Sequence, residues 1–235
     1  MNDLPQLSGP SVEPATGVAP AKLVIFCHGV GADGNDLINL APYFQKILPD
    51  ARFLSPNAPE PFDMAPPGFG DAYQWFSLGD MSPENRLAGA QKAAPILDAF
   101  IDQQLNAAGL RPKDLVLIGF SQGTMVSLHT ALRRAEPIAG IIGYSGMLVG
   151  EDLLETELKS RPPVMLCHGE VDDILPFDAM AHAEQHLRAA GLRVESLSRP
   201  GLGHGLDDQC ILAGMHFLAD IFNIDVEKLA GGGLA

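Results

Sequence analysis

The sequence predicts one α/β domain built on a mostly parallel central sheet that is flanked by helices. Short apolar runs rich in β-branched residues alternate with longer helix-like stretches along most of the chain. Most of these runs are apolar almost throughout, which is typical of strands buried on both faces of a parallel sheet. The length of 235 residues suits one α/β domain better than two small ones.

Strands and helices alternate in the order that a doubly wound sheet requires. Strands are predicted at residues 22–27, 51–55, 115–120, 138–144, 164–167 and 193–198. Helical stretches are predicted at residues 35–48, 83–108, 122–134, 178–190 and 207–222. The second of these has clear boundaries, because Ser82 suits an N-cap, Pro83 the first helical position and Gly109 the stop. Pro95 lies inside it and lacks a backbone N–H, so we expect this helix to bend or split there.

Both ends of the chain are predicted to lie outside the folded domain. Residues 1–21 carry early acids and several prolines but no apolar run, so we expect a flexible arm, not a signal peptide. The folded domain is predicted over residues 22–223, and residues 224–235 form a C-terminal tail that we expect to be disordered from 231 onward. Residues 56–81 contain many Pro and Gly residues and no helix or strand pattern, which is typical of a functional loop.

Charge and composition exclude several classes of protein. The chain has 15 Lys and Arg against 29 Asp and Glu, a net charge of −14, which repels nucleic acid and anionic lipid headgroups. Hydrophobic residues make up 46% of the chain, enough for a sizeable core. The uncharged stretch 115–132 is interrupted by Ser, Gln, Thr and His, so it is not a membrane span. The 3 cysteines are too few and too scattered for a disulfide framework or a zinc site. We therefore expect a soluble, cytoplasmic protein.

A nucleophile is predicted where the strand 115–120 meets the next helix. The sequence there reads Gly119-Phe120-Ser121-Gln122-Gly123, which is a G-x-S-x-G motif between a strand and a helix. The turn is so tight that the positions two before and two after the serine must lack bulk. Such a turn exposes the Ser121 hydroxyl at the carboxyl edge of the sheet, and we predict that this serine is the nucleophile. The alternative is a glycine-rich turn with an incidental serine.

A serine nucleophile needs a base and an orienting acid, which follow it in the order Ser, acid, His in this type of fold. The strand at 164–167 is followed by a loop with two acids, Asp172 and Asp173, and either one satisfies the order. His204 lies on a glycine-flanked loop after the last strand, and no other histidine has this order and placement. We predict His204 as the base; the alternative is a loop histidine that caps a backbone carbonyl.

The loop after the first strand has two interpretations. Gly29, Gly31 and Gly34 match the G-x-G-x-x-G pattern of a dinucleotide site, but the acid that such a site requires at the end of the second strand is missing. An oxyanion hole fits better. We predict that the backbone N–H groups of Val30 and Gln122 hold the oxyanion, and that neither a cofactor nor a metal is needed.

Several other signals are predicted to be structural. His182 and His186 are spaced as a pair on one helical face, but the H-E-x-x-H pattern and a third ligand are missing, so we interpret them as a solvated surface. Cys27 and Cys167 are interpreted as small buried residues. An apolar substrate pocket is predicted to include the residues Phe69, Trp75, Phe76 and Leu175.

Together these motifs resemble the phospholipase/carboxylesterase family of serine α/β-hydrolases, which includes the acyl-protein thioesterases. The resemblance covers about residues 22–222 and depends on the motifs FCHGVGADGND, GFSQG, HGEVDDILP and GLGHGL in order. It implies that Ser121, Asp172 and His204 form the catalytic triad, because the family's H-G-x-x-D-x-x-V-P motif places its acid at Asp172. It also implies an α/β-hydrolase fold without a large cap domain, and it is compatible with a homodimer.

The predicted function is therefore hydrolysis of small to medium carboxylic esters through an acyl-enzyme, with a small-molecule ester and water as substrates. An alternative is an acyl-protein thioesterase or lysophospholipase, since the same triad cleaves esters and thioesters. A more distant alternative is a catalytically inactive binding protein with this fold.

Overall fold

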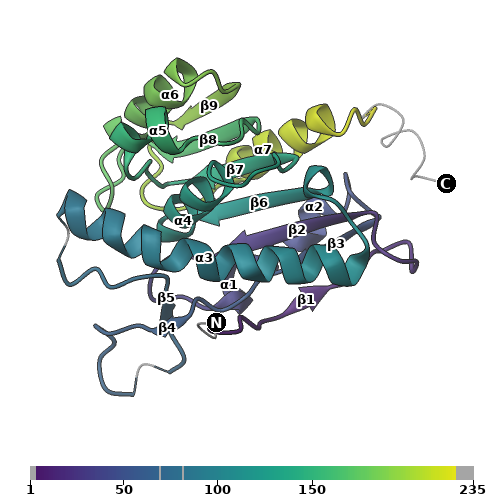
Figure 1. Ribbon diagram of the computed structural model, residues 1–235, viewed down its shortest axis with the longest axis horizontal. Coiled ribbons are helices and arrows are strands. Elements are labelled where there is room, and N and C mark those ends of the chain that lie inside the picture. Colours follow the sequence, from purple (N-terminus) through teal and green to yellow (C-terminus); the bar gives the residue numbers. More distant parts are fainter. Residues whose placement is uncertain (1–3, 69, 81, 226–235) are drawn as a thin grey trace.

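The computed structural model describes residues 4–68, 70–80 and 82–225, and these form one α/β domain around a central sheet (Figure 1). The sheet has the strand order β1-β3-β2-β6-β7-β8-β9, and every neighbouring pair is parallel except β1 with β3. The strands are β1 (Ser11–Val12), β2 (Lys22–Cys27), β3 (Ala51–Leu54), β6 (Leu115–Phe120), β7 (Gly140–Tyr144), β8 (Val164–Gly169) and β9 (Val194–Arg199). The predicted fold class is confirmed, and the six predicted strands are all present with bounds shifted by at most two residues.

Helices cover both faces of the sheet. One face packs against α3 (Pro83–Ala108), α4 (Gln122–Ala131), α5 (Leu154–Glu157) and α6 (Asp178–Ala189). The other face packs against α1 (Gly34–Ile38), α2 (Ala41–Phe44) and α7 (Asp208–Ile221). Two short 3₁₀ helices, η1 (Pro112–Asp114) and η2 (Glu151–Leu153), lie in the connections.

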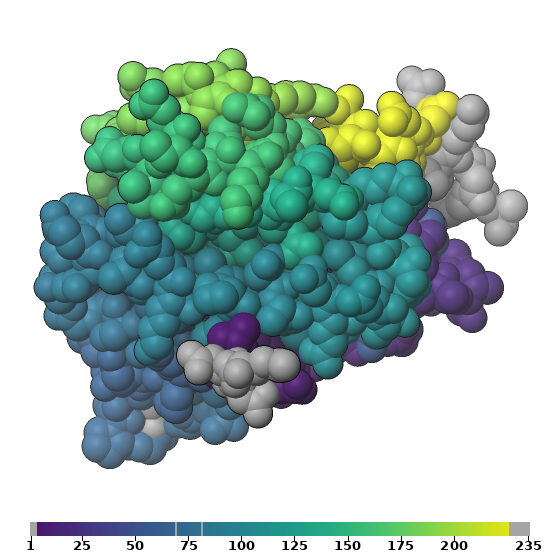
Figure 2. Space-filling view, viewed as in Figure 1, coloured from purple at the N-terminus to yellow at the C-terminus, as the bar shows by residue number. Residues whose placement is uncertain are grey.

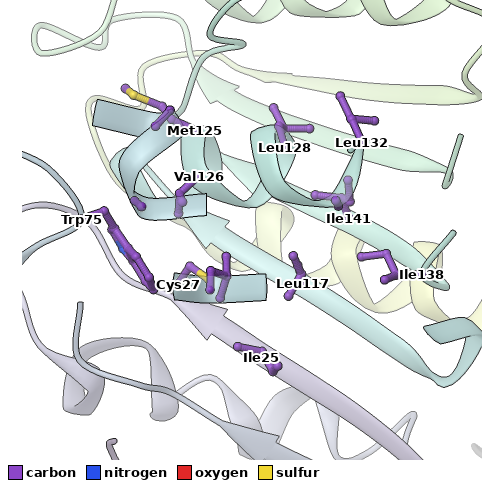
Figure 3. Packing of buried hydrophobic residues seen from close by; sticks show 14 of the residues in the cluster. Ile25, Cys27, Trp75, Leu117, Met125, Val126, Leu128, Leu132, Ile138 and Ile141 are labelled. Atoms are coloured by element: carbon purple, nitrogen blue, oxygen red, sulfur yellow. The ribbon is translucent and has the colours of Figure 1, made fainter. Parts of the chain in front are cut away.

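Alternation along the strands explains why both faces are covered. In β6, Leu117 lies in the core on the α4 side, while Val116 and Ile118 lie in the core on the α7 side. Figure 3 shows Ile25 of β2 and Leu117 together with the α4 residues of the core on that side of the sheet. Because both faces of these strands are buried, their sequences are apolar almost throughout.

The predicted helix at 35–48 is two short helices in the structure, α1 and α2. Pro42 explains the break, since it has no backbone N–H to continue the helix and its ring would crowd the carbonyl of Ile38. The helix α3, in contrast, is not split at Pro95, so that part of the expectation is wrong. Pro95 and Gln91 both lie on the exposed face of α3, where water can satisfy the unpaired carbonyl of Gln91.

The expectation of a flexible arm at residues 1–21 also needs correction for the part that the structure describes. Ser11 and Val12 form β1, which pairs with Leu54 and Phe53 of β3 at the edge of the sheet. Leu7 is buried against the core. Prolines in this segment are tolerated because an edge strand has one side without ladder partners. The tail predicted to be disordered at 231–235 lies outside the described residues.

The described residues between 56 and 80 form an excursion that contains a two-stranded sheet, β4 (Glu60–Pro61) with β5 (Tyr73–Gln74). A bridge between Ala32 and Tyr73 attaches this excursion to the loop after β2. In the space-filling view, these blue residues project at the lower left, next to the surface of α3 (Figure 2). The excursion therefore lies beside the edge of the sheet at which the parallel strands end.

Candidate active site

Ser121 lies in a strained turn between β6 and α4. Its backbone has φ 53° and ψ −118°, a conformation that residues other than glycine rarely adopt. A Cβ at Gly119 would lie 2.5 Å from the backbone of Thr124, and one at Gly123 would lie 1.8 Å from the carbonyl oxygen of Cys27. The Ser121 N–H donates to the carbonyl of Tyr144 at 2.9 Å. The predicted requirement for two glycines is thus met by two separate close approaches of the backbone.

Asp172 lies on the loop after β8 with its carboxylate completely buried. Its Oδ1 accepts hydrogen bonds from the N–H groups of Ile174 and Leu175, both at 2.9 Å. Its Oδ2 lies 2.8 Å from Nδ1 of His204 and 3.1 Å from Nε2 of His168. Burial opposes ionisation of this carboxyl, but the two N–H groups and the His204 ring outweigh burial and hold the pKa of Asp172 below its usual value.

Asp173, the other acid that the sequence allows, is exposed to solvent. The sequence alone left the two acids open, and the resemblance favoured Asp172. The structure brings Asp172 and not Asp173 against His204.

His204 lies on the loop between β9 and α7, and its side chain is 16% exposed. Its ring packs against that of Phe120, with centroids 5.0 Å apart, and Phe120 is the residue before Ser121. Arg199 and Asp207 form an ion pair across the base of the loop, with 2.8 Å between Nη2 and Oδ2. Within the part of the chain that the structure describes, the Ser121 hydroxyl makes no hydrogen bond to His204.

The loop after β2 passes beside the serine. A Cβ at Gly29 would lie 3.4 Å from Cβ of Ser121. Among residues 4–68, 70–80 and 82–225, no acceptor is paired with the backbone N–H of Val30 or of Gln122, whereas the next N–H, of Gly31, donates to Tyr73 at 2.8 Å. An oxyanion site needs unpaired N–H groups beside the nucleophile. The residues that precede these two N–H groups, Gly29 and Ser121, lie next to each other, and Gln122 also begins a helix.

The side chain of Gln122 has a role that sequence reasoning missed. Its Oε1 accepts from the N–H of Trp75 at 2.8 Å, and its Nε2 donates to the carbonyl of Phe76 at 2.7 Å. The indole N–H of Trp75 donates to the carbonyl of His28 at 3.0 Å. Gln122 thus ties the 56–81 excursion to the turn that carries Ser121. The motif identifies the glutamine, but nothing in the sequence pairs it with residues that lie 46 and 47 positions away.

Two further buried histidines position loops at this edge. His28 accepts from the N–H of Ala58 through Nε2 at 2.9 Å and donates to the carbonyl of Gly29 at 2.7 Å, and burial lowers its pKa. His168 places Nε2 against both Asp172 and the carbonyl of Leu175, each at 3.1 Å. Both histidines follow a cysteine and precede a glycine at a strand end, which is the only signal of them in the sequence.

The structure describes three of the four residues that were predicted to line the substrate pocket. Trp75, Phe76 and Leu175 are buried in the core cluster that includes α3 and α4. Figure 3 shows Trp75 beside Val126 of α4. Phe69 lies outside the described residues. Their contact with substrate stays a prediction.

The described residues contain no cluster of metal-ligating side chains, since no group of three or more His, Cys, Asp or Glu among them is arranged to hold a metal ion. His182 and His186 lie with ring centroids 4.4 Å apart, and Nε2 of His182 is 3.7 Å from the carboxylate of Glu151. None of the helices in this part of the chain is both long and apolar enough to cross a membrane.

A strand–serine–helix turn, followed by an acid and a histidine on later loops at the same edge of a parallel sheet, defines an α/β-hydrolase. Residues 9–221 match the phospholipase/carboxylesterase family, and the chain belongs to this family. It is an enzyme of the serine carboxylesterase type, so the family and class predicted from the sequence are confirmed.

Individual relatives agree with this assignment. The chain is 29% identical over 230 residues to acyl-protein thioesterase 1 of Aspergillus fumigatus, covering 90% of this chain and 92% of that protein. The crystal structure of esterase PE8 is similar with a TM-score of 0.86 and 38% identity, covering 92% of this chain and 99% of that one. The crystal structure of Arabidopsis thaliana SOBER1, with a TM-score of 0.71 and 22% identity over 86% of this chain and 99% of that one, supports the fold alone.

Proposed function

We propose that the protein hydrolyses carboxylic esters of small to medium acyl chains, with Ser121 as nucleophile, His204 as base and Asp172 as orienting acid. The observation that carries the proposal is the 2.8 Å contact between Nδ1 of His204 and the buried carboxylate of Asp172. This contact leaves Nε2 of His204 as the nitrogen that accepts a proton. The ring packs on Phe120, directly before the strained turn of Ser121. Catalytic hydrogen bonds to the nucleophile often tighten only when substrate is bound.

In the proposed reaction, His204 takes the proton of the Ser121 hydroxyl as its oxygen attacks the ester carbonyl. The N–H groups of Val30 and Gln122 donate to the oxyanion, a stabilisation for which each donor contributes about 2.7–4 kcal/mol in comparable sites. His204 then gives the proton to the leaving alcohol, which breaks the ester bond and leaves an acyl-enzyme. Water, deprotonated by the same histidine, releases the carboxylic acid and restores Ser121. Asp172 stays ionised and stabilises the charged imidazole.

Thioester hydrolysis is the second candidate function. It is supported by the relatives named acyl-protein thioesterase 1, one of which covers 90% of the chain at 29% identity. The chemistry of the triad is the same for an ester and a thioester, so the length of the acyl group distinguishes the two. An inactive binding protein is disfavoured, since each group required for the reaction is present among the described residues.

A series of esters and thioesters from acetyl to palmitoyl tests the proposal. We expect the highest kcat/KM on short and medium esters, and complete loss of activity in Ser121→Ala. Ser127→Ala is the matched control, because Ser127 is a buried serine of α4, the helix that follows Ser121, and its hydroxyl has no hydrogen-bond partner among the described residues. Activity confined to palmitoyl thioesters would replace the ester proposal with the thioesterase one. Equal activity of Ser121→Ala and wild type would remove both.

The proposal also covers the extent of the catalytic domain, the cellular location and the assembly of the protein. The catalytic domain comprises residues 22–223 together with the edge strand β1, in a cytoplasmic protein that is compatible with a homodimer. The cytoplasmic location is supported by the three free cysteines. Fractionation of cells and sedimentation of the purified protein test location and assembly.

A further inference from the structure

Two of the three cysteines lie side by side in the core behind the candidate active site. Cys167 belongs to β8 and Cys210 to the first turn of α7, and their Sγ atoms are 2.7 Å apart. Both are free cysteines, and their exposed fractions are 2% and 1%. Cys27, the third, packs in the core on the opposite face of the sheet. Only one pair is therefore placed to react.

We propose that Cys167 and Cys210 are a redox modification site, at which a disulfide bond ties β8 to α7. A disulfide holds its two sulfurs at about 2.05 Å, so a pair of thiols in contact has to close by less than about 1 Å. Neither cysteine has a role in the proposed ester hydrolysis. The inference therefore does not depend on the proposed function.

The backbones of the two cysteines are anchored by two adjacent residues, one to each cysteine. The carbonyl of Cys167 accepts from the N–H of Ser145 at 2.8 Å, and the carbonyl of Cys210 accepts from the hydroxyl of Tyr144 at 3.2 Å. The N–H of Cys210 also donates to Oδ1 of Asp207 at 2.9 Å. These anchors hold the strand and the helix in place on either side of the thiol pair.

Cys210 is the better nucleophile of the two. The S–H of Cys167 donates to the sulfur of Cys210, which lowers the pKa of Cys210 and raises that of Cys167, while burial opposes ionisation of both. Cys210 also lies in the first turn of α7, where the helix N-terminus favours a thiolate. Asp207, Arg199 and Tyr144 are the other ionisable groups that act on the pair.

Hydrogen peroxide, which is little larger than water, is a suitable oxidant for so buried a site. The Cys210 thiolate attacks one peroxide oxygen, the O–O bond breaks, and the products are a sulfenic acid on Cys210 and a hydroxide that takes up a proton. The sulfur of Cys167 then displaces the hydroxyl group from Cys210, and this group leaves as water with the thiol proton. In total, two thiols and one peroxide give one disulfide and two water molecules.

The segment that the bond would close carries the acid and base of the candidate site. Cys167 and Cys210 are 43 positions apart, and Asp172 and His204 both lie between them. Closing a loop of this length restricts the unfolded chain more than the folded one. We expect the melting temperature to rise by about 5–15 °C on oxidation.

The test uses the full chain, reduced, freed of reductant and then treated with hydrogen peroxide. We expect the intact mass to fall by two hydrogen atoms, the thiols counted after denaturation to fall from three to one, and a proteolytic peptide pair linked through Cys167 and Cys210. Cys27→Ala should behave like wild type in the mass loss and in the rise of melting temperature. Cys210→Ala and Cys167→Ala should show neither.

Wild-type protein alone can overturn the proposal. Three free thiols after oxidation, a gain of oxygen atoms without a linked peptide, or a linkage that involves Cys27 would each do so. A linked protein whose melting temperature does not rise would overturn the stabilising effect of the bond. Since these measurements need no variant, they decide the question even if a cysteine substitution prevents folding.

Discussion

Replacing Asp172 with asparagine tests the assignment of the acid, because the surroundings of this carboxylate dictate what an amide would do there. Oδ1 faces the N–H groups of Ile174 and Leu175, and Oδ2 faces the rings of His204 and His168. Asparagine has one acceptor oxygen and one donor NH₂ group. Two backbone N–H groups cannot turn away, so the amide oxygen takes the place of Oδ1 and the NH₂ group faces the histidines.

An NH₂ group facing Nδ1 of His204 forces that nitrogen to accept. The ring proton then lies on Nε2, and the base can no longer take the proton of Ser121. His168 retains the carbonyl of Leu175 at 3.1 Å as an acceptor, so the loop keeps most of its hydrogen bonds. The same wrong tautomer in other serine triads lowers kcat about 10⁴-fold, which corresponds to about 5 kcal/mol of transition-state stabilisation.

The measurement is kcat and KM for a short-chain p-nitrophenyl ester near neutral pH, with circular dichroism to verify folding. Asp173→Asn is the matched control, because it makes the same chemical change at an exposed position one residue away. We expect kcat of this control to stay within about twofold of wild type. The reasoning is refuted if Asp172→Asn keeps more than about a tenth of the wild-type kcat, or if both variants lose activity equally.

Two further predictions concern stability. Gln122→Ala leaves the buried N–H of Trp75 and the carbonyl of Phe76 without partners, so the free energy of unfolding in urea should fall by about 2–4 kcal/mol; an unchanged midpoint would contradict this. Burial, together with the nearby charge of Arg133, lowers the pKa of His129 from 6.5 to about 4. The unfolded state therefore binds more protons between these pH values, and wild-type stability should decline by up to about 3 kcal/mol as pH falls through this window. His129→Gln should lose that part of the pH dependence, and parallel curves for the two proteins would count against it.

Local patterns explain why so much of the fold could be predicted. Most of the six strands were visible because both of their faces are buried, although the edge strand β9 is partly exposed, and α3 was visible because Ser82 and Gly109 mark its ends. The error at residues 35–48 has a local cause as well, the backbone effect of Pro42. The edge strand at Ser11 could not be seen, since two residues among prolines have no periodicity and acquire their structure only by pairing with β3.

The candidate site, too, has parts that local sequence patterns predict and parts that they do not. Ser121 was found because the backbone of its turn requires glycines two positions before and two positions after the serine, which is a local pattern. His204 was found from its order along the chain and its place on a loop after the last strand. Asp172 could not be separated from Asp173 by spacing, since what distinguishes them is burial and the position of the His204 ring. The supporting roles of His168 and the Gln122 side chain depend on partners brought close only by the fold.

The end of β7 shows why a site whose parts are far apart in sequence assembles accurately. β7 pairs with β6 on one side and with β8 on the other, so it lies between the strand that leads to the serine and the strand that leads to the acid. The carbonyl of Tyr144 accepts from the N–H of Ser121, the N–H of Ser145 donates to Cys167, and the hydroxyl of Ser145 donates to Gly205 at 3.3 Å on the His204 loop.

Ser145 makes these contacts at φ 43°, a strained value for a residue other than glycine. Glycine would relieve the strain but would lose the hydroxyl that holds the His204 loop. The strain at Ser145 and that at Ser121 thus belong to one arrangement, in which two neighbouring strands end in turns that contact each other through the carbonyl of Tyr144. β7 carries no catalytic residue, yet it thereby fixes the positions of Ser121, of the strand β8 that leads to Asp172, and of the loop that carries His204 relative to one another.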